Sequence, residues 1–307
     1  MINSVLIKAI PLIAFLVTLL ASVDAASESD EVFNKIFVVD YVGNEIHLDK
    51  PAQRIIALSP HIVENVFSAG AGDKLFGTID YNLYPPEANS IRKVGGFDTL
   101  SLETIVALDP DLVIAWGSGN GSQTIAQLQS LGLPVYVDEP ITMADISKSI
   151  RDIGILAGTE TVSENVAEQF EAQLTQLRLN SENKNVVSVF YEVWHEPLQT
   201  LNKNHIISSV INVCQGENLF ADAIPLAPKI SIESVIARNP DVIVASGVDE
   251  KEPPWLSDWR QWGSITAVKN ASVFYIPPDL IQRHTTRILL GTAMMCEHLD
   301  KARDATK

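Results

Sequence analysis

The longest amphipathic pattern in the chain runs from Thr161 to Asn180. Apolar side chains recur there at steps of three and four residues, at Val162, Val166, Phe170, Leu174 and Leu177. This spacing predicts an α-helix with one apolar face, and the segment contains neither Gly nor Pro. About 20 residues at roughly 1.5 Å each span about 30 Å, the width of a small domain. The pattern therefore predicts one stiff helix near the middle of the chain.

Two similar segments stand on either side of this helix. Residues 101–116 read SLETIVALDPDLVIAW, and residues 231–246 read SIESVIARNPDVIVAS. In each, a serine suited to capping a helix precedes a short amphipathic stretch, which is followed by Pro-Asp and an apolar run typical of a buried strand. The repetition predicts two halves of similar plan, one before and one after the central helix.

Short apolar runs alternate with amphipathic stretches through both halves. The first half opens with a hairpin signal at Gly43-Asn44. Strands are predicted there at 54–58, 74–79, 111–115 and 135–137, with helices at 61–69, 123–131 and 141–156 and a loop at 117–122. Strands of the second half are predicted at 186–193, 242–245 and 273–276, with helices at 205–214, 232–238 and 285–303.

Strands that alternate with helices in this way form parallel sheets. The sequence therefore predicts an α/β fold in which two parallel-sheet α/β lobes are joined by a single long helix, with a ligand cleft between the lobes. We expect the N-terminal lobe at 36–156, the linker helix at 157–182 and the C-terminal lobe at 183–307.

The first 25 residues are typical of a secretory signal peptide. Lys8 precedes an apolar run from Ala9 to Leu20, and Val23-Asp-Ala25 resembles a cleavage site. The run is too short to span a bilayer comfortably, so we expect cleavage after about Ala25 rather than a membrane anchor. The sequence predicts a soluble, exported protein.

Composition and charge narrow the possible functions. The 307 residues are 46% hydrophobic and carry a formal net charge of −16, which disfavours nucleic acid and anionic membrane surfaces as partners. The two cysteines, Cys214 and Cys296, both lie in the second half. An even count in an exported chain indicates one disulfide, with two buried free thiols as the alternative.

Candidate ligand-contact residues lie after the predicted strands, because parallel sheets bind ligands beyond the carboxyl ends of their strands. These positions are Ser59, His61, Tyr81, Trp116, Trp194, His195, Gly247 and 279–283, and Phe97 precedes the first repeat. Flat aromatic faces with a few polar groups suit a large, partly apolar ligand. We assign Tyr81 to the site because polar residues and two prolines surround it, whereas Trp116 fits the core or the site equally well.

Known catalytic motifs fit the chain poorly. The segment from Gly117 to Ser122 follows a predicted strand, but Ser replaces the third glycine of a dinucleotide fingerprint. His195-Glu196 is followed by proline, without a second His at zinc-protease spacing, and there is no G-x-S-x-G motif. The four histidines at positions 61, 195, 205 and 284 are interpreted as hydrogen-bonded rather than metal-binding. The sequence thus predicts no catalytic residue and no metal site.

Glu103 and Glu233 occupy the same place in the two repeats, two residues after the capping serine. Carboxylates in a first helical turn stabilise the positive end of the helix, and this alone would account for both. The alternative interpretation is a pair of acidic contacts, one on each lobe, for a partner with two-fold symmetry. The repetition does not separate the two interpretations.

These motifs together resemble those of a known family. From about Ile36 to Arg303 the chain resembles the helix-linked class of periplasmic substrate-binding proteins, which serve ABC importers of cobalamin, haem and ferric siderophores. The resemblance lies in PxxRIIALSPxxxE at 51–64, LExIVALxPDLVIAW at 102–116 and CxGENLF at 214–220. The first motif is shared by the class. The other two, with YxxYPP at 81–86 and the cysteine pair, are closer to the cobalamin-binding members.

The resemblance implies a periplasmic protein that is not an enzyme and has no cofactor of its own. It implies that cobalamin is the transported ligand and that an ABC transporter permease dimer is the partner of a monomeric binding protein. It also implies a disulfide between Cys214 and Cys296 and docking of Glu103 and Glu233 on the permease. With the strand ends, the expected ligand contacts are Tyr81, Phe97, Trp116, Trp194, Asp279, Leu280, Ile281, Gln282 and Arg283.

The chain departs from the cobalamin-binding pattern at several positions of the pocket. Phe97, Ala227 and Leu280 replace tryptophans, and residues 194–197 (WHEP) have no counterpart there. These changes keep a haem or ferric-siderophore ligand open as an alternative. Anionic siderophores usually require several basic pocket residues, and the candidates here are Arg283, Lys229 and Arg287. An enzyme or metal-processing protein on the same fold is a further alternative, which would need an acid, base or metal set.

Overall fold

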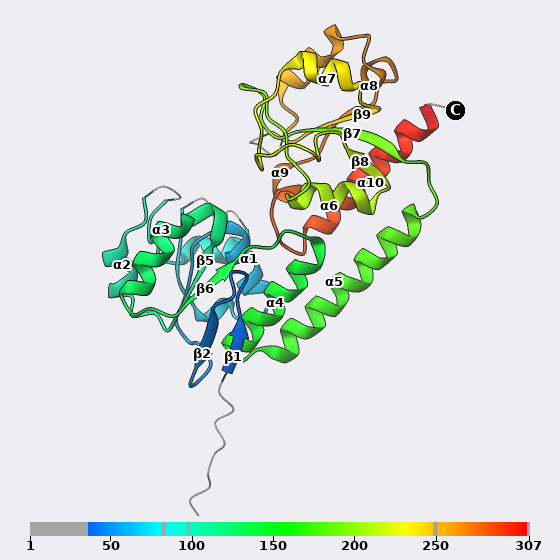
Figure 1. Cartoon of the computed structure of the whole chain (residues 1–307). Coiled ribbons are helices and arrows are strands. Elements are labelled where there is room, and N and C mark those ends of the chain that lie inside the picture. The colour runs from blue at the N-terminus through cyan, green and yellow to red at the C-terminus, as the bar shows by residue number, and fades with distance from the viewer. Residues whose placement is uncertain (1–35, 81–83, 97–98, 248–250, 306–307) are drawn as a thin grey trace, which may run out of the picture. The chain divides into compact units, whose positions relative to one another are not determined.

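The computed structural model describes residues 36–80, 84–96, 99–247 and 251–305. Two α/β lobes are connected by helix α5 (Glu160–Ser181), as the sequence predicts (Figure 1). The predicted signal peptide and the candidate ligand contacts Tyr81 and Phe97 lie outside the described residues. Within the described residues, no helix is long and apolar enough to cross a membrane.

The first lobe is built on a four-stranded parallel sheet. Its strand order is β4 (Leu75–Thr78), β3 (Ile55–Ala57), β5 (Leu112–Trp116) and β6 (Val135–Asp138). An antiparallel hairpin precedes this sheet, with strands β1 (Ile36–Val39) and β2 (Glu45–Leu48). The lobe's helices are α1 (Pro60–Ser68), α2 (Leu102–Ala107), α3 (Gly117–Ser130) and α4 (Met143–Ala157), with 3-10 turns η1 (Gly72–Lys74) and η2 (Pro86–Ser90).

The second lobe repeats the plan with another four-stranded parallel sheet. Its strand order is β10 (Val273–Tyr275), β9 (Val242–Ala245), β7 (Val187–Glu192) and β8 (Gly216–Asn218). Its helices are α6 (Ile206–Val213), α7 (Ile232–Arg238), α8 (Thr266–Lys269), α9 (Pro278–Ile281) and α10 (Ile288–Ala305), with the 3-10 segment η3 (Pro254–Gln261).

Strands β3, β5, β7 and β9 are buried on both faces, which explains why they read as continuous apolar runs. In β5, Leu112 and Ile114 belong to one apolar cluster, whereas Val113 and Ala115 belong to another on the opposite face. Strand β9 alternates in the same way between two clusters. In open parallel sheets of this kind, ligands bind beyond the carboxyl ends of the strands.

Helix α5 follows the predicted amphipathic pattern. Phe170 and Leu174 are buried, Val166 and Leu177 pack against the core, and Val162 is exposed near the helix start. Gly158 separates α5 from α4 with φ 69°, a left-handed conformation that favours glycine, and a Cβ at this position would lie 2.8 Å from the Pro51 ring. The chain therefore turns sharply before the long helix begins at Glu160.

The expected loop at 117–122 is wrong, because α3 already begins at Gly117. The Ser118 amide and hydroxyl both donate to the Glu139 carboxylate, and the Asn120 side chain accepts from the Trp116 amide at 2.7 Å. These side chains stabilise a helical turn in a segment whose glycines give no helical signal. The turn breaks at Gly121, where φ is 77°, before the regular helix continues.

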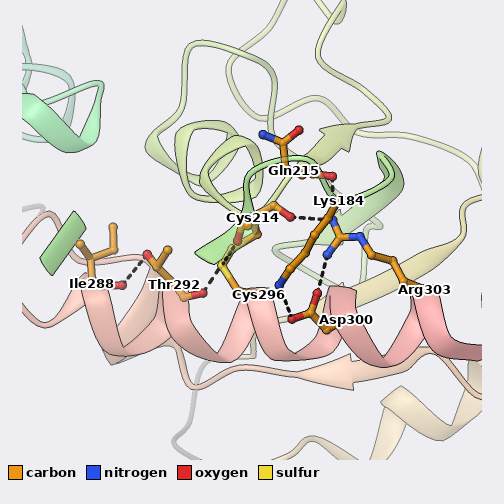
Figure 2. The surroundings of a disulfide bond; sticks show 9 residues. Lys184, Cys214, Gln215, Ile288, Thr292, Cys296, Asp300 and Arg303 are labelled. Atoms are coloured by element: carbon orange, nitrogen blue, oxygen red, sulfur yellow. Dashed lines mark hydrogen bonds and ion pairs between the residues drawn. A yellow bond between two sulfur atoms is a disulfide. The ribbon is translucent and has the colours of Figure 1, made fainter. Parts of the chain in front are cut away.

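The predicted disulfide is present between Cys214, at the end of α6, and Cys296 in α10 (Figure 2). The Arg303 guanidinium, two turns further along α10, donates to the Cys214 and Gln215 carbonyls at 2.7 and 2.9 Å. Asp300 accepts from Arg303 and from Lys184 at 2.7 and 2.8 Å. The bridge and this ionic network therefore hold α6, α10 and the segment after α5 together.

Candidate functional site

The carboxyl ends of β3 and β5 place an aromatic and a histidine side chain together in the first lobe. Ser59 caps α1, accepting from the Ile62 amide, and its hydroxyl lies 2.9 Å from His61 Nδ1. His61 Nε2 lies 3.3 Å from the buried carboxylate of Asp138, at the end of β6. The Trp116 ring meets the His61 ring edge-on, with 5.2 Å between centroids. Trp116 is half-buried, so it contributes both to the core and to the strand-end surface.

The two lobes contact each other through residues of α1 and the segment that precedes α10. Arg287 forms a two-pronged ion pair with the buried Glu64 carboxylate at 2.8 and 2.9 Å. The Arg287 guanidinium also lies 4.0 Å from the centre of the Tyr84 ring, a cation–π contact. The Asn65 side chain donates to the His284 carbonyl at 2.9 Å. These contacts connect the lobes beside the strand ends.

A group of histidines lies at the same junction, of which His61 and His284 are buried and His205 is partly buried. The His284 ring centroid is 5.3 Å from that of His61 and 6.0 Å from that of His205. Burial lowers the pKa of His205 to about 4, and it lowers the pKa of His284 well below its usual value. His205 is neutral near pH 7, and its Nδ1 accepts from the Ile207 amide at 3.2 Å, which caps α6. The part of the chain that the structure describes holds no group of three or more His, Cys, Asp or Glu side chains arranged around a metal ion.

The predicted contact segment at 279–283 follows β10 and comprises most of the short helix α9 and the two residues after it. Asp279 and Arg283 pair with each other at 2.9 Å, so their charges largely cancel. Asp279, Leu280, Gln282 and Arg283 are partly buried, whereas Ile281 is fully buried in the core. Arg283 Nη1 is buried and, among the described residues, has no hydrogen-bond partner. The segment therefore offers a polar surface with little net charge and one unused donor.

The carboxyl ends of β7 and β9 form a pocket of about 260 Å³ in the second lobe. It is lined by Val193, Trp194, His195, Glu196, Gly247 and Trp255. The Trp194 side chain is exposed, and its indole nitrogen donates to the Glu196 carbonyl at 2.9 Å. The predicted residues Trp194 and His195 therefore lie on the wall of a real cavity at the expected edge of the sheet.

A buried acid that the sequence analysis missed organises this pocket. Glu192, the last residue of β7, is fully buried, and its two carboxylate oxygens lie 2.8 Å from His195 Nδ1 and 2.7 Å from the Trp259 indole nitrogen. Burial raises the pKa of Glu192, and the hydrogen bonds from His195 and Trp259 act in the opposite direction. The His195 ring stacks on Trp255 at 4.5 Å, with 7° between the planes. The sequence feature that could have pointed to this part of the pocket is the tryptophan-rich segment 255–262, which follows two prolines.

Glu103 and Glu233 have equivalent surroundings in the two lobes. Each is exposed at the second position of its helix, α2 or α7. The capping serines, Ser101 and Ser231, accept from the amides of Thr104 and Ser234. Hydrogen bonds from the backbone amide of Glu233 itself and from the Ser231 hydroxyl lower the pKa of the Glu233 carboxyl. Each lobe thus presents one exposed carboxylate at the start of a short helix.

Comparisons with known proteins agree with this architecture. The pattern of the family described as periplasmic binding protein matches residues 55–280. The chain is 35% identical over 253 residues to the vitamin B12-binding protein of Vibrio campbellii, covering 82% of this chain and 91% of that protein. The crystal structure of the periplasmic vitamin B12 binding protein BtuF of Vibrio cholerae is similar, with a TM-score of 0.76, 33% identity, and coverage of 82% of this chain and 98% of that one.

Proteins with other ligands share the fold at lower identity. The periplasmic heme-binding protein RhuT from Roseiflexus sp. RS-1 matches with a TM-score of 0.69 and 22% identity, covering 83% of this chain and 100% of that one. At this identity the likeness shows the fold alone.

Proposed function

Since the chain belongs to the periplasmic binding protein family, we propose that it captures cobalamin and delivers it to the permease of an ABC importer. It is a binding protein and not an enzyme, and cobalamin is its cargo rather than a cofactor. The observation that carries the proposal is the identity of 33 to 35% to vitamin B12-binding proteins over about four fifths of the chain. The protein acts in the periplasm, which agrees with the signal peptide expected at residues 1–25.

The charges near the strand ends favour a ligand without strong net charge. Of the three cations available to an anionic chelate, Arg283 is paired with Asp279, Arg287 is paired with Glu64, and Lys229 is exposed. A corrinoid has a broad flat face and a rim of amides, which need hydrogen-bond partners more than counter-charges. Arg283 Nη1 supplies such a donor, and Trp116 and Trp194 supply apolar faces.

We place the cleft between the two lobes, because the carboxyl strand ends of a parallel sheet are the edge at which a ligand is expected to bind. We assign contacts there to Trp116, Trp194, Asp279, Leu280, Gln282 and Arg283, and to Tyr81 and Phe97 outside the described residues. Ile281 is fully buried, so it anchors the segment to the core and is not assigned a contact with the ligand.

Calorimetry with cyanocobalamin tests the ligand. Trp194→Ala is expected to weaken binding by about 5- to 150-fold, because one exposed indole face provides roughly 1–3 kcal/mol of apolar contact. Leu131→Ala is the matched control: Leu131 is similarly exposed, but it follows the far end of α3, at the opposite edge of the sheet. Cyanocobalamin affinity should change by less than about threefold over a roughly tenfold range of ionic strength, because charge pairing contributes little.

Haemin serves as the competing ligand in the same titration. Absence of heat with cyanocobalamin, together with tight haemin binding that weakens steeply with salt, would contradict the cobalamin assignment and support the haem alternative.

Docking on the permease is assigned to Glu103 and Glu233, one on each lobe of a monomer, facing the two subunits of a permease dimer. The Glu103→Ala, Glu233→Ala double variant should keep its cobalamin affinity and bind the permease roughly tenfold or more weakly, because interfacial charge pairs contribute strongly to association. Permease-containing vesicles and a labelled binding protein provide the measurement. Glu160→Ala is the control, since Glu160 is also an exposed first-turn glutamate. Normal permease binding by the double variant would leave the two glutamates as helix-end charges only.

A further inference from the structure

The histidine of the second-lobe pocket has one ring nitrogen fixed, and among the described residues the other ring nitrogen has no hydrogen-bond partner. His195 Nδ1 lies 2.8 Å from Glu192 Oε1, and the other Glu192 oxygen accepts from Trp259. A buried carboxylate in this place accepts a hydrogen bond from Nδ1–H, and in that tautomer the ring lone pair lies on Nε2. The Asp258 carboxylate lies 3.8 Å from Nε2, which is too far for a hydrogen bond.

The ring is held in one orientation while part of it stays accessible. Stacking on Trp255 at 4.5 Å restricts rotation of the imidazole, and about one third of the side chain is exposed. Histidines that bind a metal through one ring nitrogen usually donate a hydrogen bond from the other, often to a carboxylate. The carboxylate fixes the tautomer and makes the metal-binding nitrogen a better electron donor. The arrangement resembles half of a metal site.

The metal ion and its remaining coordinating atoms would have to be supplied by the ligand. The described residues contain no group of three or more side chains that would hold a metal ion of their own. A corrin ring supplies four equatorial nitrogens to its cobalt and needs from a protein only one axial ligand. His195 lines a pocket at the carboxyl ends of two adjacent strands, where the proposed function places the corrinoid.

We propose that His195 Nε2 binds directly to the cobalt of the captured corrinoid, on the axial face that water occupies in aquocobalamin. This inference rests on the proposed function. The Nε2 lone pair forms a cobalt–nitrogen bond, one water molecule leaves the cobalt, and cobalt keeps its oxidation state. Cyanide holds the same position too firmly to be displaced, so cyanocobalamin binds without this bond. The residue selects among corrinoids by the exchangeability of their axial ligand.

Paired titrations with aquocobalamin and cyanocobalamin test the bond. Wild-type protein should bind aquocobalamin at least about tenfold more tightly than cyanocobalamin, since one coordination bond adds to the shared contacts. The visible spectrum of bound aquocobalamin should become that of its imidazole adduct. His195→Gln should lose both the preference and the spectral change, so that its affinities for aquocobalamin and cyanocobalamin agree within about twofold. His47→Gln, which alters an exposed histidine of β2, should behave as wild type.

The possible outcomes distinguish failure of the proposed cobalt bond from failure of the proposed function. A wild-type spectrum that stays that of the aquo form, or a His195→Gln variant that keeps the spectral change, overturns the cobalt bond while cobalamin binding stands. Failure of the wild type to bind either corrinoid instead overturns the proposed function. If His195→Gln binds neither form, the wild-type spectrum decides alone.

Discussion

Replacement of both Cys214 and Cys296 by alanine is expected to lower the free energy of unfolding by about 4 kcal/mol. The bridge closes a loop of 82 residues, so its loss allows the unfolded chain many more conformations. Both sulfurs are buried, and α6 is attached to α10 at this point (Figure 2). Denaturant unfolding followed by circular dichroism measures the change as a lower midpoint.

Reduction of the wild-type protein is the control for this experiment, because it opens the bridge without removing any side-chain volume. Reduced wild type should lose most of the same stability, and the remaining difference reports the small cavities left by alanine. Titration of the denatured, unreduced protein should find no free thiol. Two free thiols, or an unchanged midpoint after reduction, would show that the bridge does not form in solution.

Glu64→Gln is expected to cost about 3 kcal/mol of stability, because it leaves the Arg287 guanidinium without its counter-charge. The Glu64 side chain is 2% exposed and that of Arg287 is 19% exposed, so water replaces the lost carboxylate poorly. The pair joins α1 of the first lobe to the start of α10, so we expect the junction between the lobes to loosen as well. The measurement is chemical unfolding of the purified protein, and amide hydrogen exchange at the junction reports the loosening.

The matched control for this variant is Glu164→Gln. Glu164 also forms a two-pronged pair, with Arg151, but its side chain is 51% exposed. Exposed pairs contribute less than about 1 kcal/mol, so this variant should stay close to wild type. Equal losses from the two substitutions would contradict the idea that burial gives the Glu64–Arg287 pair its importance.

Most elements of the fold were predictable because their signals are local. The apolar runs that became β3, β5, β7 and β9 read as strands from their composition alone, and α5 reads as a helix from its period. Strand β8 was missed, since Gly-Glu-Asn carries no apolar signal. It forms because its backbone pairs with β7, and the Asn218 side chain donates to Leu201 and Ser208 at 2.8 and 2.7 Å.

The pocket was predictable only in part. Trp194 and His195 follow a predicted strand, so topology alone directs attention to them. Glu192 ends an apolar strand, and only packing shows that its buried carboxylate meets His195 and Trp259. Trp255 and Trp259 come from a segment more than fifty residues further along the chain, without a strand or helix pattern that relates them to β7.

The sequence by itself determined the class of fold, the two similar lobes, the long connecting helix and the edge of each sheet where we propose that the ligand binds. These follow from hydrophobic periodicity and chain order, which are properties of neighbouring residues. Only the tertiary structure decided which polar groups meet. Glu64 and Arg287 are 223 residues apart, and His195 receives its orientation from Glu192 and Trp255 together. Such pairings depend on distances set by the packing of whole elements, and no local pattern encodes those distances.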